Sequence, residues 1–88
     1  MHIVKRKGHA EKFEPKKTHR SIYKACLNAS LPRKKATTIA NSVTKQLQTW
    51  IRNKPYINAH TLFLKIIELL KKKDKNAAFM YETHRDIN

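Results

Sequence analysis

The chain has 88 residues, which suits one domain over residues 1–88 and is too short for two. It carries 20 Lys and Arg against 6 Asp and Glu, and the net charge of +14 favours an anionic partner, such as nucleic acid or nucleotide phosphates, without identifying it. Leu, Ile, Val and Phe together number 20 of the 88 residues, which excludes the composition of a disordered chain.

The N-terminal residues predict a β-hairpin. Residues 2–6 read as a short strand, residues 7–10 as the turn, and residues 11–14 as the returning strand. Gly8, the only glycine, suits the turn because glycine takes positive φ without a steric cost. Phe13 supplies the large apolar side chain of the returning strand.

Two helices are expected after the hairpin. The first covers residues 16–29, behind a proline that suits its first turn, and residues 30–32 (Ser-Leu-Pro) break it. Its small residues favour close packing, and we expect Cys26 to be a core residue rather than a reactive thiol. The second covers residues 33–53, where one face is apolar: Ala36, Ile39, Ala40, Val43, Leu47, Trp50 and Ile51.

The C-terminal part predicts a short strand and two more helices. Residues 56–57 are the extended piece, and Asn58 or a neighbour can cap the next helix. That helix is apolar over residues 62–70 and ends in three lysines at 71–73, which we interpret as solvated and dipole-compensating rather than as a nucleic-acid patch. A last helix is expected over residues 75–86. Together the elements predict an α+β domain in which a small hairpin lies against a helical bundle.

The sequence shows no pattern for catalysis or metal binding. Its five histidines are scattered without HxxxH or HExxH spacing, and a single glycine rules out a glycine-rich phosphate loop. Cys26 alone gives no disulfide and no CxxC pair, so we expect a reducing, cytoplasmic setting. No apolar run approaches a membrane span and no signal-peptide pattern is present, so we expect no membrane partner.

Side chains can nevertheless hold phosphate. Lys5 and Arg6 are adjacent on a strand, so they point to opposite faces. Lys16 and Lys17 open the first helix, where backbone amides and the helix dipole also favour anions. A basic strand over such a helix start would make a compact polyphosphate site, but solvated surface lysines explain the same pattern equally well.

The string IVKRKGHAEKFEPKK at 3–17, followed by SIYKAC at 21–26, resembles the opening of the ATP-cone domain. That family has a strand with V-x-K-R-x-G, an acid and a hydrophobe in the returning strand, a lysine in the first helical turn and an S-I-x-K-A segment. The later segments YINAHTLFLKIIELL and AAFMYETHR also fit, the second being similar to the family's Ala-x-x-Tyr-x-x-x-Arg ending. The resemblance covers about the whole chain.

The resemblance implies a regulatory module that binds ATP or dATP, in which a three-stranded sheet covers a four-helix bundle. Such modules occur at the N-terminus of ribonucleotide reductase large subunits, and after a zinc ribbon in the bacterial repressor of reductase genes. Mg²⁺ can accompany the phosphates, although the sequence shows no carboxylate cluster for it.

The resemblance also implies six nucleotide-contacting residues: Val4, Lys5, Arg6, Glu11, Lys17 and Ile22. The first three match the strand that approaches the base and phosphates. Glu11 matches an acid on the ribose or adenine side, Lys17 matches a phosphate-binding lysine, and Ile22 matches the apolar wall under the adenine.

The chain departs from the family pattern at two positions. Glu14 stands where Asp is frequent, and Ala59 stands where Ser or Thr often precedes the third helix. Phe63 and Tyr81 match contacts that vary within the family, so we interpret them as core residues rather than as ligand contacts.

Three functions are therefore considered. The first is a stand-alone adenine-nucleotide sensor without chemistry of its own, which acts through self-association or through docking to a partner related to ribonucleotide reductase or transcription. The alternative is a small basic DNA- or RNA-binding regulator that resembles the repressor without its zinc ribbon. The third is a structural oligomerisation domain, in which the long helix with Trp50 and the apolar face at 62–70 pair with a second copy.

Overall fold

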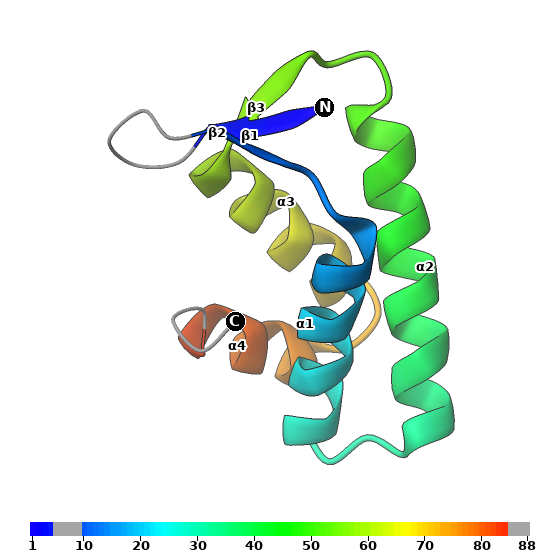
Figure 1. Ribbon diagram of the computed structural model, residues 1–88. Coiled ribbons are helices and arrows are strands. Elements are labelled where there is room, and N and C mark those ends of the chain that lie inside the picture. Colours follow the sequence, from blue (N-terminus) through cyan, green and yellow to red (C-terminus); the bar gives the residue numbers. More distant parts are fainter. Residues whose placement is uncertain (5–9, 85–88) are drawn as a thin grey trace.

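The computed structural model describes residues 1–4 and 10–84 (Figure 1). Within these residues the chain is α+β, with one three-stranded sheet at one end of a group of four helices. The α+β class predicted from the sequence is confirmed. The helices are α1 (Pro15–Asn28), α2 (Arg33–Ile51), α3 (Ala59–Lys71) and α4 (Lys75–Thr83).

The sheet joins the N-terminal hairpin to the segment before α3. Its strands are β1 (His2–Val4), β2 (Ala10–Lys12) and β3 (Tyr56–Asn58). The strand order is β2-β1-β3, with β1 antiparallel to β2 and parallel to β3. In the centre of the sheet Ile3 lies opposite Glu11 on one side and Ile57 on the other. Because β2 leads toward α1 and β3 runs directly into α3, two helix N-termini lie beside the sheet.

Proline, a side-chain cap and a residue with positive φ mark the ends of the helices. Pro15 occupies the first turn of α1, where its missing N–H costs nothing. The Asn58 side chain accepts a hydrogen bond from the His60 amide at 2.8 Å and so caps α3 as predicted. After α1, Ser30 adopts a φ of 65°, and the Leu31 amide donates to the Cys26 carbonyl at 3.1 Å, which closes the helix end and turns the chain toward α2.

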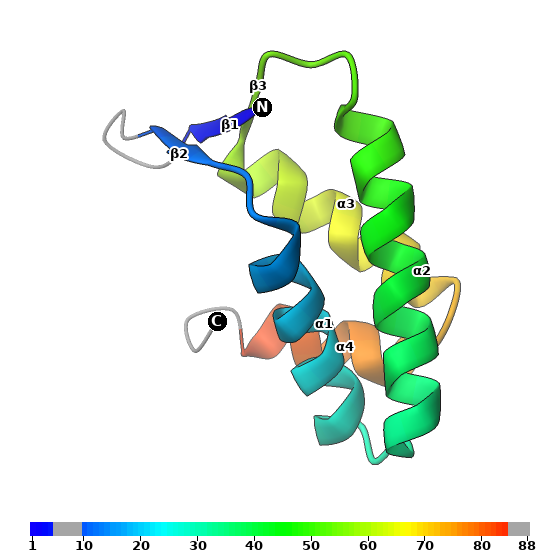
Figure 2. The same cartoon turned by 45° about the vertical axis from the view of Figure 1, so that its right-hand side comes forward.

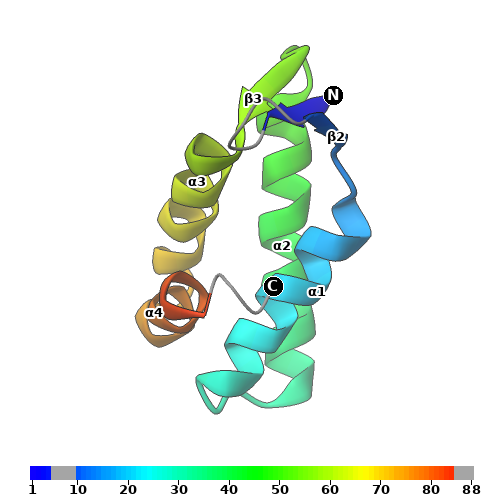
Figure 3. The same cartoon turned by 60° about the vertical axis from the view of Figure 1, so that its left-hand side comes forward.

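Helices α1 and α2 pack side by side, and α3 and α4 cover the other side of this pair (Figures 2 and 3). The buried core draws on every helix and on the strand β3. Its fully buried larger side chains are Ile22, Leu47, Ile66, Leu70, Val43 and Cys26. Cys26 is thus a core residue, as expected. Leu62, Leu69 and Leu70 are also buried in this core, so most of the apolar face at 62–70 is used within the chain, whereas Leu64 is 52% exposed.

The observed element boundaries differ from the predicted ones by a few residues. Helix α1 covers Pro15–Asn28 rather than 16–29, and β3 extends one residue beyond the predicted 56–57. Ala10, which the sequence placed in the turn, already belongs to β2, whereas the strand ends at Lys12 and Phe13 follows it with its ring buried in the core. Helix α2 ends at Ile51 rather than residue 53. Helix α4 ends at Thr83, and the remainder of the predicted helix, residues 85–86, lies outside the described residues, as do residues 5–6 of the first strand.

Candidate functional site

The connection from β2 to α1 is held in place by Phe13. Its side chain is buried in the core, and its amide donates a hydrogen bond to the Met1 carbonyl at 3.1 Å. Glu14 follows in an extended conformation at the N-cap position, and its carbonyl accepts from the amides of Lys17 and Thr18. The start of α1 is therefore fixed against the N-terminal strand, and its first-turn side chains emerge at a defined place beside the sheet.

Glu14 and Lys17 form an ion pair on the first turn of α1. The Lys17 Nζ lies 3.1 Å from Glu14 Oε2, and both side chains are largely exposed. The hydrogen bond to Glu14 and its negative charge raise the pKa of Lys17, and the charge of Glu11 adds to this effect. The hairpin acid and the helix lysine are thus close enough to interact, and Lys17 carries a positive charge throughout the neutral range.

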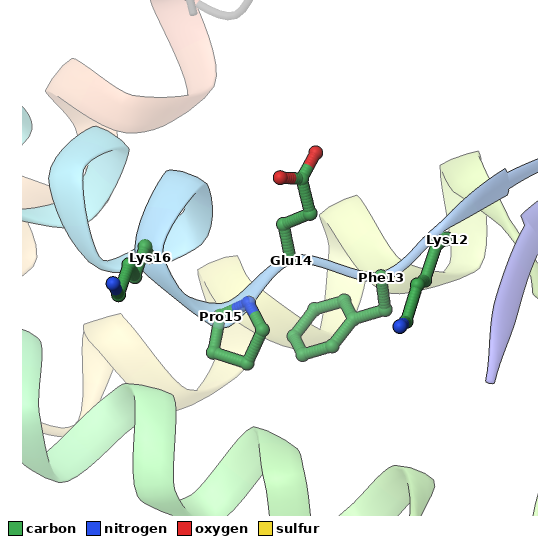
Figure 4. Close-up of a pocket in the computed structure, with 5 residues that line it drawn as sticks. All are labelled: Lys12, Phe13, Glu14, Pro15 and Lys16. Carbon is green, nitrogen blue, oxygen red and sulfur yellow. The ribbon is translucent and has the colours of Figure 1, made fainter.

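The β2–α1 connection borders a hollow of about 430 Å³. Its lining residues are Lys12, Phe13, Glu14, Pro15 and Lys16. Figure 4 shows Lys12, Phe13, Pro15 and Lys16 on the side that faces α2, whereas the Glu14 side chain points the opposite way, toward α4. The first turn of α1 consequently serves two surfaces, the Glu14–Lys17 pair on one side and this hollow on the other.

A second hollow, of about 280 Å³, lies farther along the contact between α1 and α2 and is lined by Pro15, Lys16, His19 and Thr44. His19 Nε2 and Asn41 Oδ1 are 2.7 Å apart, which links the two helices beside this hollow. Thr44 is 6% exposed, and among the described residues its Oγ1 has no hydrogen-bond partner.

Three aromatic rings stack between α3 and α4. The ring centroids of His60 and Phe63 are 6.3 Å apart and those of Phe63 and Tyr81 are 5.7 Å apart, with an interplanar angle of 28° in both pairs. Tyr81 is buried, and Phe63 is half-buried against the core. The interpretation of these two residues as core side chains therefore agrees with their burial, and the partly exposed edge of Phe63 leaves an apolar surface beside the first turn of α3.

Four of the six sequence-predicted contact residues lie within the described part of the chain. Val4 ends β1, half-buried between Ala10 and Asn58. Glu11 is exposed on β2, Lys17 is exposed on the first turn of α1, and the charge of Glu11 contributes to raising the pKa of Lys17.

Ile22 lies apart from that group, because it is fully buried and shows no surface to a ligand. Lys5 and Arg6 lie outside the described residues.

Sequence reasoning missed two features of this region. The i, i+3 spacing of Glu14 and Lys17 was a visible signal for their ion pair. The hollow at Thr44 gave no signal, because it depends on how α1 and α2 pack.

Within the described residues, no group of three or more His, Cys, Asp or Glu side chains is placed to hold a metal ion. In the same part of the chain, every helix is too short or too polar to cross a membrane.

Comparison with known proteins adds one finding. A family model for the ATP cone domain matches residues 1–86, from the first strand to the end of α4 and just beyond. A comparison with curated proteins gives no match.

Proposed function

Because the chain belongs to the ATP-cone domain family, whose members are regulatory nucleotide-binding modules, we propose that it is a sensor of ATP or dATP. The observation that carries the proposal is the match of the family model over residues 1–86. We propose further that the domain binds the nucleotide without transforming it, because ATP cones are regulatory rather than catalytic.

The site proposed for the nucleotide is the Glu14–Lys17 side of the sheet end. Lys17 offers an exposed ammonium group at a helix N-terminus, where backbone amides and the helix dipole add to the attraction for phosphate. The predicted hairpin contacts Val4, Lys5 and Arg6 precede this point in the chain, with Glu11 on the returning strand as the polar group for the ribose or adenine side. Mg²⁺ is expected only as an ion carried by the phosphates.

Glu14 and Ile22 take different parts in this proposal. A phosphate that approaches Lys17 must compete with the Glu14 carboxylate, since both are anions that bind the same ammonium group. We therefore propose that the ion pair opens or is shared when nucleotide binds. Ile22 is fully buried, so it would support the wall of the site from beneath rather than contact the adenine through exposed surface.

The output proposed for binding is a change in self-association or in docking to a partner. An effector shifts such an equilibrium only by its difference in affinity for the two states. Partners related to ribonucleotide reductase or to transcription follow from the settings in which the family occurs. Sedimentation of the protein with and without ATP tests self-association directly, and one unchanged mass across concentrations would leave partner docking as the output.

Isothermal titration of nucleotide-free protein with ATP, dATP and GTP tests the binding proposal. We expect saturable binding of the adenine nucleotides, weaker binding of GTP, and affinity about tenfold or more lower in Lys5→Gln and Lys17→Gln, since each change removes one charge-assisted phosphate contact. Lys24→Gln is the matched control, because Lys24 is also exposed on α1 but lies seven residues farther along the helix. Equal affinity in Lys17→Gln and wild type would contradict the proposed site.

A further inference from the structure

The acidic residues of this chain are distributed unevenly, and the helices α1 and α2 contain none. From residue 15 to residue 67 the sequence has no Asp or Glu, whereas Lys and Arg recur throughout. The acids are confined to the hairpin and the connection that follows it, to α3 near its end, and to the region of α4 and beyond. Apart from Lys17, which pairs with Glu14, the cations of these two helices therefore have no acidic side chain on their own helix to neutralise them.

Four cations of these helices make up what we call the α1–α2 face: Lys16, Arg20, Lys34 and Lys45. All four side chains are exposed. Lys16 and Arg20 are four residues apart, so they are neighbours on one side of α1. On α2, Lys34 and Lys45 lie eleven residues apart, which is three turns, so they share one stripe of that helix.

The α2 stripe adjoins α1 at the contact between the helices. Asn41 lies on the α2 stripe, between the two lysines, and it is bonded to His19 of α1 at 2.7 Å. The hollow of about 280 Å³ opens at the same contact, with Lys16 and His19 on its rim. Thr44 also lines it, and among the described residues its buried hydroxyl lacks a partner. The Lys16 ammonium group on this rim supplies the positive charge that a phosphate oxygen would bind.

We infer that the α1–α2 face binds the phosphate backbone of nucleic acid, with one phosphate seated in the hollow at Lys16, His19 and Thr44. The α2 stripe is about 16 Å long at 1.5 Å per residue. A strand of duplex DNA carries one phosphate per about 3.4 Å of helix axis, so the face spans about five phosphates and offers four cations to them. Such contacts position a protein on a duplex without reading its sequence.

A nucleic-acid backbone fits this face better than an anionic membrane does. A helix that lies on a membrane presents large apolar side chains between its cations. Here the residues that accompany the cations at the contact are His19, Asn41 and exposed threonines. Three of the four exposed large hydrophobic side chains of the described chain, Tyr56, Leu64 and Phe79, lie instead on β3, α3 and α4, and the fourth, Leu27, lies near the end of α1.

The inference stands apart from the proposed nucleotide site. Lys17 and Glu14 are not part of the α1–α2 face, and Figure 4 shows Glu14 pointing away from the side on which Lys16 lies. Loss of one activity therefore leaves the other testable.

Fluorescence anisotropy with a labelled 20-base-pair duplex, measured between about 50 and 200 mM salt, tests the inference against general attraction to a basic protein. The face variant combines Arg20→Gln, Lys34→Gln and Lys45→Gln. The control variant combines Lys71→Gln, Lys72→Gln and Lys73→Gln at the exposed end of α3, and it removes the same three charges. Circular dichroism establishes that both variants fold.

We expect the face variant to bind at least about tenfold more weakly near 100 mM salt and to lower the slope of log K against log salt by roughly 2.7, because each lost phosphate contact removes about 0.9. The control variant should retain the wild-type slope. Equal losses of duplex affinity in both variants would overturn the inference, because net positive charge alone would then explain the binding. It would also be overturned by an absence of duplex binding at about 50 mM salt, or by tighter binding of wild type to vesicles of phosphatidylserine and phosphatidylcholine than to the duplex.

Discussion

The substitution Thr44→Val should stabilise the protein. Thr44 lies in the middle of α2, is 6% exposed, and carries a buried hydroxyl that has no partner within the described residues. An unsatisfied buried polar group costs about 1–3 kcal/mol. Valine keeps the branched shape and replaces the hydroxyl with a methyl group, and its helix propensity is close to that of threonine.

The expected gain in the free energy of unfolding is about 1 kcal/mol, the lower end of that range. For a domain of this length such a gain raises Tm by roughly 4–8 °C. Thermal and urea unfolding followed by circular dichroism at 222 nm measure the change. An unchanged urea m value would show that the substitution altered stability and not the compactness of the native or denatured state.

Thr38→Val is the matched control on the same helix. The Thr38 hydroxyl is exposed and donates to the Lys34 carbonyl at 3.0 Å, so its replacement should change stability by less than about 0.5 kcal/mol. The reasoning would be refuted if Thr44→Val destabilised the protein by about 1 kcal/mol or more, since the hydroxyl would then have a partner in the folded chain.

Three other predictions concern Glu14, Cys26 and Asp74. Glu14→Gln should raise ATP affinity severalfold in isothermal titration, because it removes the carboxylate that competes for Lys17, and unchanged or weaker binding would count against that competition. Burial raises the pKa of the Cys26 thiol to about 11. Its unfolded pKa is about 8.5, so only the unfolded chain ionises as pH rises above that value. Stability should therefore fall between about pH 8.5 and 11, more steeply than in Cys26→Ala, and equal pH profiles of urea unfolding in the two proteins would contradict this. Asp74→Ala should cost about 1 kcal/mol in thermal unfolding, because the Asp74 side chain accepts from the Ala77 amide at 2.8 Å and caps α4, whereas Asp74→Asn should retain most of that stability.

Periodicity predicted the helices because one face of each had to be buried. Six of the seven apolar positions traced along α2 are buried, and the seventh, Trp50, lies half-buried at its edge. There the ammonium groups of Lys54 and Lys65 lie 4.8 and 5.4 Å from the ring centroid, which allows an aromatic side chain to remain partly in solvent. The hydrophobic pattern therefore identified the helix and its buried face, but it did not predict that Trp50 stays half-exposed beside two lysines.

Contacts between helices were beyond the reach of sequence. Thr44 is polar, yet it is buried because it occupies the side of α2 that meets α1. The bond between His19 and Asn41 joins residues 22 positions apart, and their local sequence does not predict it. The hollow at this contact depends on the same packing, whereas the Glu14–Lys17 pair was readable because its partners lie one turn apart.

The predicted nucleotide contacts divide in a similar way. Glu11 and Lys17 came from the family resemblance of the hairpin and first helix, and the charge of Glu11 contributes to raising the pKa of Lys17. Ile22 came from the same resemblance, but its complete burial reflects the packing of α1 into the core. Its contact with adenine stays a prediction, and the burial favours support of the site from beneath over direct contact.

The location of the nucleotide is tested most directly by recording amide nitrogen–proton correlation spectra of the labelled protein during a titration with ATP. The account predicts saturable shifts at the sheet end, centred on residues 11–18 and the hairpin, with little change at Asn41 and Lys45 of α2. Shifts centred on α2, or uniform small shifts that do not saturate, would contradict a nucleotide site at the Glu14–Lys17 side of the domain.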